Sequence, residues 1–415
     1  MSVAEQTAIE ATAPPLGRTR LFLVLAGLYL AQAIPAYLMV AAVPPIMREQ
    51  GVSRTTIGLI AILLVPGVLK FLWAAKIDQI RPVARAHRAS WILITQTGTV
   101  LALFALAFFE PTDIVAFMTI GLIMSVLVST QDIATDGYAV RQLAARDRPL
   151  GNAIQGGAVA LGVVVGGTLS LVIYHHFGWR PMIWTMCAAS LLPLIAALSM
   201  REDADPEPAD QPRASLKAFW ARPEAREALL IALVYRASEG LIKAMEGPYL
   251  VDRGVPLDIV GYLSGGAAAT AGLIGSGLAA ILMLRLGASG VLTLLGLLRT
   301  ICFTLFAAHA LDLVTGWPTL FGAAAFQTLI RYMEIVALYS VFMAVSSKAQ
   351  PGTDFTILAC AQLVIYLIGA SLAGVLADLM GYGPLFALAA VLSLVAVIFT
   401  RSRLRRQSAA AVLAD

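Results

Sequence analysis

Runs of about 20 apolar residues, each long enough to cross the hydrocarbon core of a bilayer, recur along almost the whole chain. Hydrophobic residues make up 59% of the 415 positions and charged residues only 13%, which is too little charge for a water-exposed surface. Unpaired backbone polar groups are costly in lipid, so runs of this length are predicted to be helices. The sequence therefore predicts an all-α polytopic membrane protein surrounded by a lipid bilayer.

Twelve spanning helices are predicted, with boundaries accurate to about four residues. A polar stretch at 200–227, rich in Asp, Glu and Pro, divides them into six and six and is typical of a linker. We therefore expect one six-helix bundle over 20–199, a second over 228–400, and tails at 1–19 and 401–415. The spans are placed near 20–42, 57–77, 90–109, 113–140, 150–175, 180–199, 228–250, 258–285, 289–309, 316–346, 354–379 and 382–400.

The Lys and Arg residues between the spans predict the orientation of the chain, because such residues accumulate on the cytoplasmic side. If the N-terminus is cytoplasmic, twenty of these residues fall in cytoplasmic segments. Four fall outside, namely Arg48, Arg54, Arg180 and Arg253. Both termini are therefore expected in the cytoplasm, with the helices in a bacterial inner membrane.

Two sets of Gly, Pro and Gln residues recur in the second half of the chain. Pro45, Gly51, Val52 and Gly58 return 203 residues later, and Gln155, Gly162, Gly167 and Leu169 return 207 residues later. Chance similarity of apolar sequences explains matches of Leu or Val but not two shared patterns of these types. Two six-helix pseudo-repeats across a cytoplasmic linker resemble the major facilitator fold, in which substrate binds between the halves near the midplane.

Charged side chains lie within several predicted spans, where each costs several kcal/mol unless it faces protein or water. In span four, Asp132 and Asp136 are four residues apart and project from one helical face. Two like charges at this spacing repel, which implies a cationic partner or a shared proton. Asp132 is predicted to face a cavity and to carry protons. Asp136 fits either such a site or a cytoplasmic gate, in which Asp136 and Asp78 pair with Arg141 or Lys76.

Span seven carries four charges of alternating sign on one helical stripe, where residues three or four apart can pair. These charges are Arg236, Glu239, Lys243 and Glu246. Nothing structural requires four charges in one span, so we predict that they line a cavity. Arg236 and Lys243 are candidate substrate ligands, and Glu239 is a candidate proton carrier.

Span ten carries Gln327, Arg331 and Glu334. Because Arg stays protonated and offers five donors, Arg331 is predicted to hold an anionic group of the substrate. A structural ion pair between Arg331 and Glu334 is the alternative, and Glu334 is also a candidate proton carrier. Pro35 is expected to kink span one and to free backbone carbonyls. The remaining candidate substrate ligands are Gln32, Gln131, Gln155, Gln327, Gln362, Lys70 and Tyr235.

Several other functions are excluded or disfavoured by the sequence. The chain contains no Gly-Lys dipeptide, which excludes a P-loop and direct use of ATP. Neither the four His nor the three Cys residues have metal-ligand spacing, so no metal, cofactor or enzymatic activity is predicted. The basic residues lie in short loops, which argues against nucleic acid. The expected partner is a small-molecule substrate, transported by a monomer with H+ as the candidate coupling ion.

Three motifs carry a closer resemblance within the superfamily. The stretches Gly51–Gly58, Lys70–Asp78 and Gln131–Asp136 are similar to the grouping of AmpG-type muropeptide permeases and acetyl-CoA transporters. Within this grouping, the chain length and the stretch Gly151–Gln155 look more like siderophore permeases of the RhtX/FptX type. That resemblance implies import of an iron–siderophore complex from periplasm to cytoplasm by alternating access. A muropeptide permease is the alternative, and drug export and a non-transporting membrane receptor are further ones.

Overall fold

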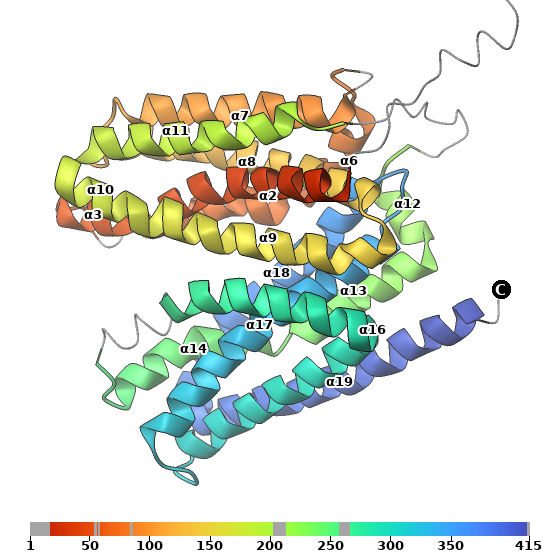
Figure 1. Cartoon of the computed structure of the whole chain (residues 1–415). Helices are drawn as coiled ribbons and strands as arrows, with labels where there is room; N and C mark the ends of the chain where they lie inside the picture. The colour runs from red at the N-terminus through yellow and green to blue at the C-terminus, as the bar shows by residue number, and fades with distance from the viewer. Residues whose placement is uncertain are drawn as a thin grey trace, which may run out of the picture. The chain divides into compact units, whose positions relative to one another are not determined.

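The computed structural model describes residues 17–53, 56, 59–83, 86–201, 213–256 and 266–412, which are helices joined by short connections (Figure 1). Residues 1–16 and 413–415 of the predicted tails lie outside the described residues. So do most of the predicted linker, at 202–212, and part of span eight, at 257–265. Four residues of the motif at 51–58 also fall outside, namely Arg54, Thr55, Ile57 and Gly58.

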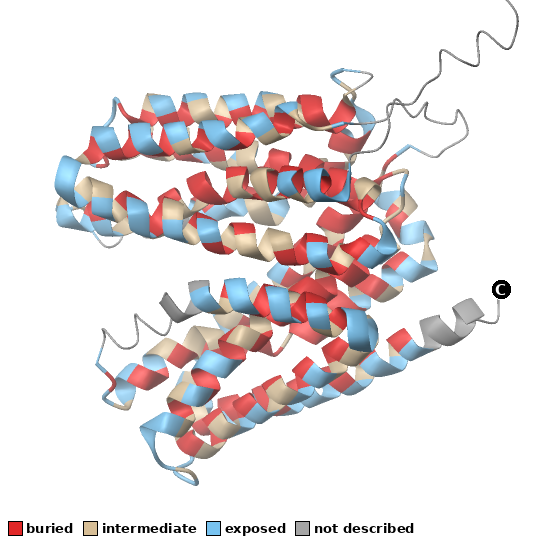
Figure 2. Ribbon diagram, in the orientation of Figure 1, coloured by how far each residue is buried: buried red, intermediate tan, exposed pale blue. Residues whose placement is uncertain are grey.

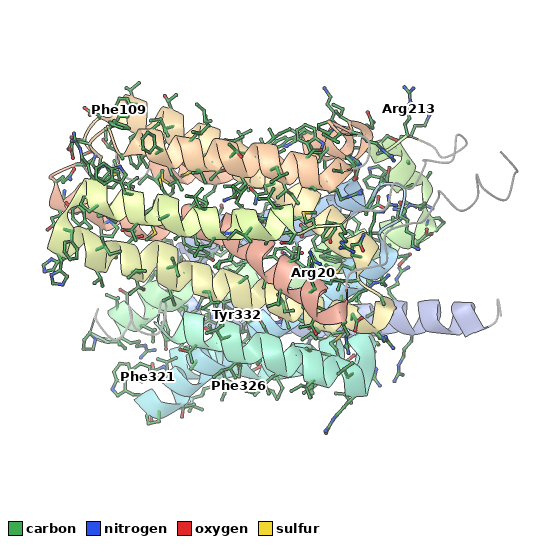
Figure 3. All side chains as sticks on the ribbon, turned by 45° about the horizontal axis from the view of Figure 1, so that its top comes forward. Arg20, Phe109, Arg213, Phe321, Phe326 and Tyr332 are labelled. Carbon is green, nitrogen blue, oxygen red and sulfur yellow. The ribbon has the colours of Figure 1, made fainter. Side chains whose placement is uncertain are left out.

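The chain divides into two compact units. Unit 1 consists of Met1–Gln142, Val165–Ser215 and Lys348–Thr353. Its helices are α2 (Arg18–Tyr37), α3 (Val43–Glu49), α5 (Val65–Leu69), α6 (Phe71–Gln79), α7 (His87–Leu106), α8 (Ile114–Gln142), α10 (Ser170–Phe177) and α11 (Trp179–Leu198). In unit 1, α2, α7, α8 and α11 pack side by side (Figure 1). Phe109, after α7, and Arg213 lie at opposite ends of the unit (Figure 3).

Unit 2 consists of Leu143–Val164, Leu216–Ser347 and Asp354–Asp415. Its core is α16 packed against α17 and α19, with α9 also in contact with α16 and α17. Its helices are α9 (Arg148–Gly162), α12 (Leu216–Ala221), α13 (Pro223–Arg236), α14 (Glu239–Asp252), α16 (Gly266–Ala310), α17 (Trp317–Val345), most of α18 (Pro351–Met380) and α19 (Tyr382–Val412).

Over the described residues, nine helical runs are long and apolar enough to cross a membrane. One of them, Thr270–Ala310, contains two predicted spans, because Gly287 adopts φ 64° and turns the chain between them. A positive φ of this size is open to Gly at little cost. Two further predicted spans are present as interrupted helices, over Leu59–Gln79 and Pro223–Asp252. These runs together account for the twelve predicted spans.

Exposed residues lie along the outer faces of the helices (Figure 2), and many of them are large and apolar. Val115, Leu284 and Leu379 are each more than 70% exposed. A soluble monomer rarely exposes contiguous apolar surface on this scale. Lipid is the solvent that these faces require, which agrees with the predicted membrane protein.

The internal repeat is visible in the backbone. Gly51 and Gly254, which are 203 residues apart, both end a helix with φ 85°. In each case the next residue donates a 2.9 Å backbone hydrogen bond, Val52 to Met47 and Val255 to Leu250. Gly178 and Gly381, also 203 apart, form a second matched pair, with φ 82° and 80°. The repeat predicted from the glycine and proline pattern is therefore confirmed.

The helix bounds extend the same spacing through the later spans. Helices α8 and α17 both have 29 residues and begin 203 residues apart. The helical stretch from 148 to 177 likewise matches α18, which runs from 351 to 380. The spacing of 207 predicted for this span, from Gln155 and Gln362, is therefore too long by four residues. Four residues are about one helical turn, so the shifted pattern keeps its residues on one face and imitates a true match.

Candidate functional site

In unit 1, the two carboxylates of span four have different partners. Lys70 from the α5–α6 junction forms an ion pair with Asp132 on α8. The cationic partner that the Asp132–Asp136 spacing implied is therefore present. Asp136 is 1% exposed, and the Tyr29 hydroxyl donates to its Oδ1 at 3.1 Å. Lys70 and Asp132 are the charged groups that act on Asp136 electrostatically.

Amide and hydroxyl groups surround these carboxylates. The Gln32 amide donates to Thr135 Oγ1 at 2.9 Å, joining α2 to α8. Gln131 is fully buried, and neither atom of its amide makes a hydrogen bond to the described residues. Pro35 lies inside α2 and precedes a π-helical turn, Leu38–Ala42, so the predicted distortion of span one is present as a change of helix type.

Asp78 has other partners than the predicted ones. Its Oδ1 accepts from Arg88 at 3.2 Å, and its Oδ2 accepts from the backbone and hydroxyl of Thr353 at 2.6 and 2.7 Å. Among the described residues its hydrogen-bond partners do not include Lys76 or Arg141. A carboxylate at the first turn of α18 satisfies free N–H groups and complements the helix dipole. The gate predicted from Asp136, Asp78 and Arg141 remains a prediction.

In unit 2, Glu239 joins two guanidinium groups from different helices. Glu239 begins α14, is fully buried, and forms ion pairs with Arg236 through Oε2 and with Arg331 through Oε1, the latter at 2.8 Å. The pairing predicted within span seven is thereby confirmed for Arg236. The Arg331 guanidinium also lies 5.3 Å from the centre of the Tyr366 ring on α18. Gly240 permits this arrangement, because a side chain there would collide with the α18 backbone at Tyr366.

Glu334 pairs with Arg299. The alternative of a structural pair between Arg331 and Glu334 is not found among the described residues, where Arg331 pairs with Glu239. Arg299 and Glu334 are 1% and 0% exposed, and their charged atoms are 2.9 Å apart. The Tyr235 hydroxyl lies 2.8 Å from Glu334 Oε1, and the Arg299 ring contact with Tyr235 is 4.5 Å to the centroid. Arg299 also donates to Ser393 Oγ at 3.0 Å. Arg299 lies within the predicted span at 289–309 but was not among the predicted site residues.

The other predicted ligands of unit 2 are also buried or partly buried. Lys243 donates to both oxygens of Glu246 at 3.1 Å, which confirms the second pair within span seven. Gln327 is 1% exposed, and neither of its amide atoms bonds to a described residue. The side-chain carbonyls of Gln155 and Gln362 are likewise without a hydrogen bond to the described residues.

Some polar residues of unit 1 correspond to polar residues of unit 2 at the spacing of 203. In unit 1 the Gln96 amide donates to the Ser190 carbonyl at 2.8 Å, and in unit 2 the matching residues Arg299 and Ser393 are in contact. Gln131 matches Glu334, and Gln32 matches Tyr235. We call these four matched pairs the shared frame. It carries amides in unit 1 and an ion pair in unit 2.

Several of the remaining polar residues have apolar counterparts in the other half, whereas Asp136 matches Tyr339. Lys70 and Asp132 of unit 1 match Leu273 and Ile335. In unit 2, the matched residues of the first half are Ala33 for Arg236, Ala36 for Glu239, Val128 for Arg331 and Met124 for Gln327. The helices fold with apolar residues at these places, so packing alone does not require the polar ones.

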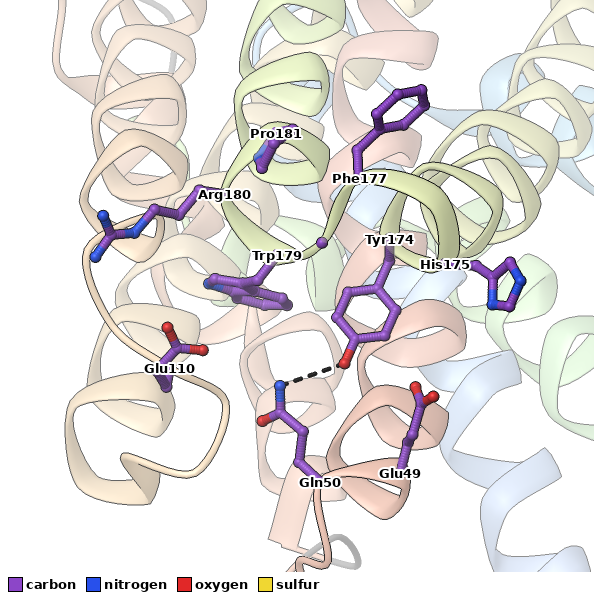
Figure 4. Close-up of a pocket in the computed structure, with 10 residues that line it drawn as sticks. Glu49, Gln50, Glu110, Tyr174, His175, Phe177, Trp179, Arg180 and Pro181 are labelled. Carbon is purple, nitrogen blue, oxygen red and sulfur yellow. Dashed lines mark hydrogen bonds between the residues drawn. The ribbon is translucent and has the colours of Figure 1, made fainter.

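A separate hollow of about 540 Å³ lies at the end of unit 1 where α3, α10 and α11 meet (Figure 4). Gln50 donates to the Tyr174 hydroxyl across it at 3.4 Å. None of the predicted site residues lines it. The hollow is bordered by Glu49, Gln50, Glu110, Tyr174, His175, Phe177, Gly178, Trp179, Arg180 and Pro181.

Comparison with known proteins relates the chain to transporters. The chain is 26% identical over 370 residues to the anhydromuropeptide permease of Escherichia coli K12, covering 86% of this chain and 74% of the relative. It is 20% identical over 371 residues to the putative transporter AmpG 4 of Rickettsia conorii, covering 85% and 88%.

Solved structures share the fold at low sequence identity. The major facilitator transporter FucP in its outward conformation has a TM-score of 0.71 and 15% identity, covering 92% of this chain and 98% of that one. A bacterial homologue of ferroportin, outward-facing, has a TM-score of 0.71 and 16% identity, covering 93% and 99%. The family model of the Major Facilitator Superfamily matches residues 21–237, more than half of the chain. The chain therefore belongs to the Major Facilitator Superfamily.

Proposed function

We propose that the chain is a secondary transporter that imports an anhydromuropeptide by alternating access. The observation that carries the proposal is the relation to the anhydromuropeptide permease, which extends over 86% of the chain. The AmpG-type relative from Rickettsia conorii supports the same substrate class. These relatives favour the muropeptide alternative over the siderophore import predicted from short motifs.

We place the protein in a bacterial inner membrane with both termini in the cytoplasm. The twenty-to-four distribution of Lys and Arg supports this orientation. With the same orientation, import is the direction from periplasm to cytoplasm. One chain is sufficient for the cycle in this proposal.

The chemistry of the substrate suits the buried polar groups. An anhydromuropeptide joins a sugar to a short peptide, so it presents hydroxyls, amides and carboxylates. Glutamine side chains both donate and accept hydrogen bonds, and Arg binds carboxylates through a planar fork. Candidate ligands of these types are Gln32, Gln131, Gln155, Gln327, Gln362, Arg236 and Arg331.

We further propose that import is coupled to protons through Asp136. Asp132, Glu239 and Glu334, the carriers predicted from sequence, each pair with a Lys or Arg residue. Asp136 has the Tyr29 hydroxyl as its contact and repels Asp132. Among the described residues, this group contains the carboxylates of Asp132 and Asp136 and the cation of Lys70, and one bound proton balances these charges.

The experiment is uptake of a radiolabelled anhydromuropeptide by cells that lack their own permease and express this chain. We expect accumulation that a protonophore abolishes. A ferric siderophore offered to the same cells is the control for the other substrate class. Siderophore accumulation without muropeptide uptake, in cells with the protein in the membrane, would overturn the proposal.

A further inference from the structure

Tyr366 on α18 lies against the guanidinium group of Arg331. The guanidinium carbon is 5.3 Å from the centre of the ring, which is within the range of a cation–π contact. The Nε of Arg331 is 2.8 Å from Glu239 Oε1. A guanidinium group is planar, so a ring on its face fixes its plane, and a carboxylate on its edge fixes its rotation within that plane. Tyr366 and Glu239 together therefore set the direction in which this group points.

The buried Arg299 of the same unit has a setting of the same kind. Its guanidinium pairs with Glu334 at 2.9 Å and lies 4.5 Å from the centre of the Tyr235 ring. The two settings differ in exposure. The Arg299 side chain is 1% exposed and Tyr235 is fully buried, whereas the Arg331 side chain is 28% exposed and Tyr366 is half-buried. The setting at Arg299 is closed to a ligand, and the setting at Arg331 is open to one.

The position of Tyr366 is fixed by its backbone. A Cβ atom at Gly240 would lie 2.2 Å from the carbonyl oxygen of Tyr366 and 2.7 Å from the backbone nitrogen of Ala370, so α14 and α18 are in close contact here. Glu239 directly precedes Gly240 in the chain. One contact between two helices thus places both the carboxylate and the residue that carries the ring, and this contact does not depend on the side chain of Tyr366.

The first half of the chain shows that the helices form without the ring. Val163 stands at the place of Tyr366, and Val128 stands at the place of Arg331. The helical stretch from 148 to 177, which contains Val163, has the same length as α18. The ring is therefore found in the half that has the arginine, and helix formation does not account for it.

We propose that Tyr366 is a positioning residue, whose ring holds the Arg331 guanidinium in the orientation that binds an anionic group of the substrate. The inference rests on the proposed function, in which Arg331 is a candidate ligand, and it identifies the residue that orients this ligand. Because the ring acts through Arg331, binding of a substrate that lacks the anionic group should not depend on the ring.

The test compares two probes by titration calorimetry on the purified full-length protein in lipid nanodiscs. One probe is an anhydromuropeptide with a single alanine, which has one carboxylate, and the other is its alaninamide. On the unchanged protein we expect the acid to bind about tenfold more tightly than the amide, because the amide loses a charge-assisted hydrogen bond to Arg331.

Substitutions of the ring localise the effect. Tyr366→Val installs the residue of the first half and should reduce the preference for the acid about threefold, as expected for the loss of a half-exposed cation–π contact. The affinity for the amide should stay the same. Tyr366→Leu, which is larger than Val, is a second variant with the same expected result. Tyr366→Phe keeps the ring and should keep the tenfold preference.

Phe399→Val is the matched control, because it removes a ring from an arginine outside the predicted site. The Arg403 guanidinium lies 5.0 Å from the centre of the Phe399 ring, and Arg403 pairs with Glu227 at 2.9 Å. This variant should keep the full preference for the acid.

Each variant is also unfolded thermally to confirm that it is folded. If a folded Tyr366→Val or Tyr366→Leu protein keeps the full preference, or binds both probes more weakly by the same factor, Tyr366 does not position Arg331. Equal binding of both probes to the unchanged protein would also overturn the inference and leave the proposed function standing. Binding of neither probe to the unchanged protein would overturn the proposed function as well.

Discussion

Units 1 and 2 build a polar centre on the same helical plan but fill it with different polar side chains. In the shared frame, unit 1 has Gln96 and Gln131 where unit 2 has Arg299 and Glu334. Around that frame, the described residues of unit 1 include Lys70, Asp132 and Asp136, and those of unit 2 include Arg236, Arg331 and Glu239. Most of these residues stand where the other half has an apolar residue, and Asp136 stands where it has Tyr339. The difference separates what the helices need for packing from what each half offers to a ligand.

In the proposed function, unit 1 carries the proton and unit 2 binds an anionic group of the cargo. A buried carboxylate can be neutralised by H+, and a guanidinium group can bind a carboxylate of the cargo. A symporter needs both, and in this account the two halves of the chain supply one each. Four predictions test this division.

The largest expected effect concerns the ion pair of the shared frame. Arg299→Gln or Glu334→Gln alone leaves a buried charge without its partner and should cost about 3–5 kcal/mol of stability. The double variant reproduces the two amides of unit 1, so most of that loss should be recovered. Thermal or denaturant unfolding in detergent measures this recovery, with the two single variants as controls. If the stability losses of the two single variants simply add in the double variant, the shared frame of unit 2 does not accept the amides of unit 1.

The second effect concerns Arg331. Arg331→Val installs the residue of the first half, so the helix should still fold. Transport should fall by about 100-fold, since the charge-assisted bonds lost are typically worth about 1.5–3 kcal/mol. Initial uptake rates of the labelled anhydromuropeptide, corrected for the amount of protein in the membrane, give the result. Arg331→Lys keeps the charge without the fork and should lie between the two. Full activity in Arg331→Val would remove this residue from the site.

The third effect concerns Asp136. Asp136→Asn keeps the hydrogen bond to Tyr29 but cannot exchange a proton, so uphill accumulation should fall by about tenfold or more. Exchange of labelled for unlabelled substrate at equal concentrations, which needs no proton gradient, should continue. Asp132→Asn is the comparison variant, because Asp132 is paired with Lys70. Uphill accumulation at the normal level would eliminate Asp136 as the proton carrier.

The smallest effect comes from the reverse exchange in unit 1. Gln96→Arg and Gln131→Glu together should create the ion pair of unit 2, since both side chains are buried and occupy the matched places. The double variant should be more stable than the two singles predict, by an interaction energy of about 0.5–3 kcal/mol. A double-mutant cycle of unfolding free energies gives this value. If the cycle shows no interaction energy, the two substituted side chains do not form the expected ion pair.

The sequence predicted the spans, the repeat and most residues of the two polar centres, because span length, glycine turns and buried charge leave local signals. It did not predict most of the pairs between helices. Arg331 and Glu334 are three apart, so a local pair looked sufficient, yet Glu334 is bound to Arg299 on another helix. Arg299 had one signal in the sequence, its spacing of 203 from Gln96. That signal was obscured by the incorrect spacing of 207, which differs from it by a single turn.

The partner of Asp78 on α18 was missed for a similar reason. Its partner Thr353 is 275 residues away and contributes a backbone N–H, a group that every residue except proline has. No residue type marks such a contact in advance. The charge of Asp78 indicated that a partner was needed, and only the fold identified the first turn of α18.

The most direct measurement replaces all four added residues of unit 2 by those of the first half, as Arg236→Ala, Glu239→Ala, Gln327→Met and Arg331→Val in one chain. Calorimetric titration with the anhydromuropeptide and thermal unfolding are then run on the same sample. The account predicts a folded protein with a melting temperature within a few degrees of the original and no detectable binding. A chain that no longer folds, or one that binds as tightly as before, would contradict it.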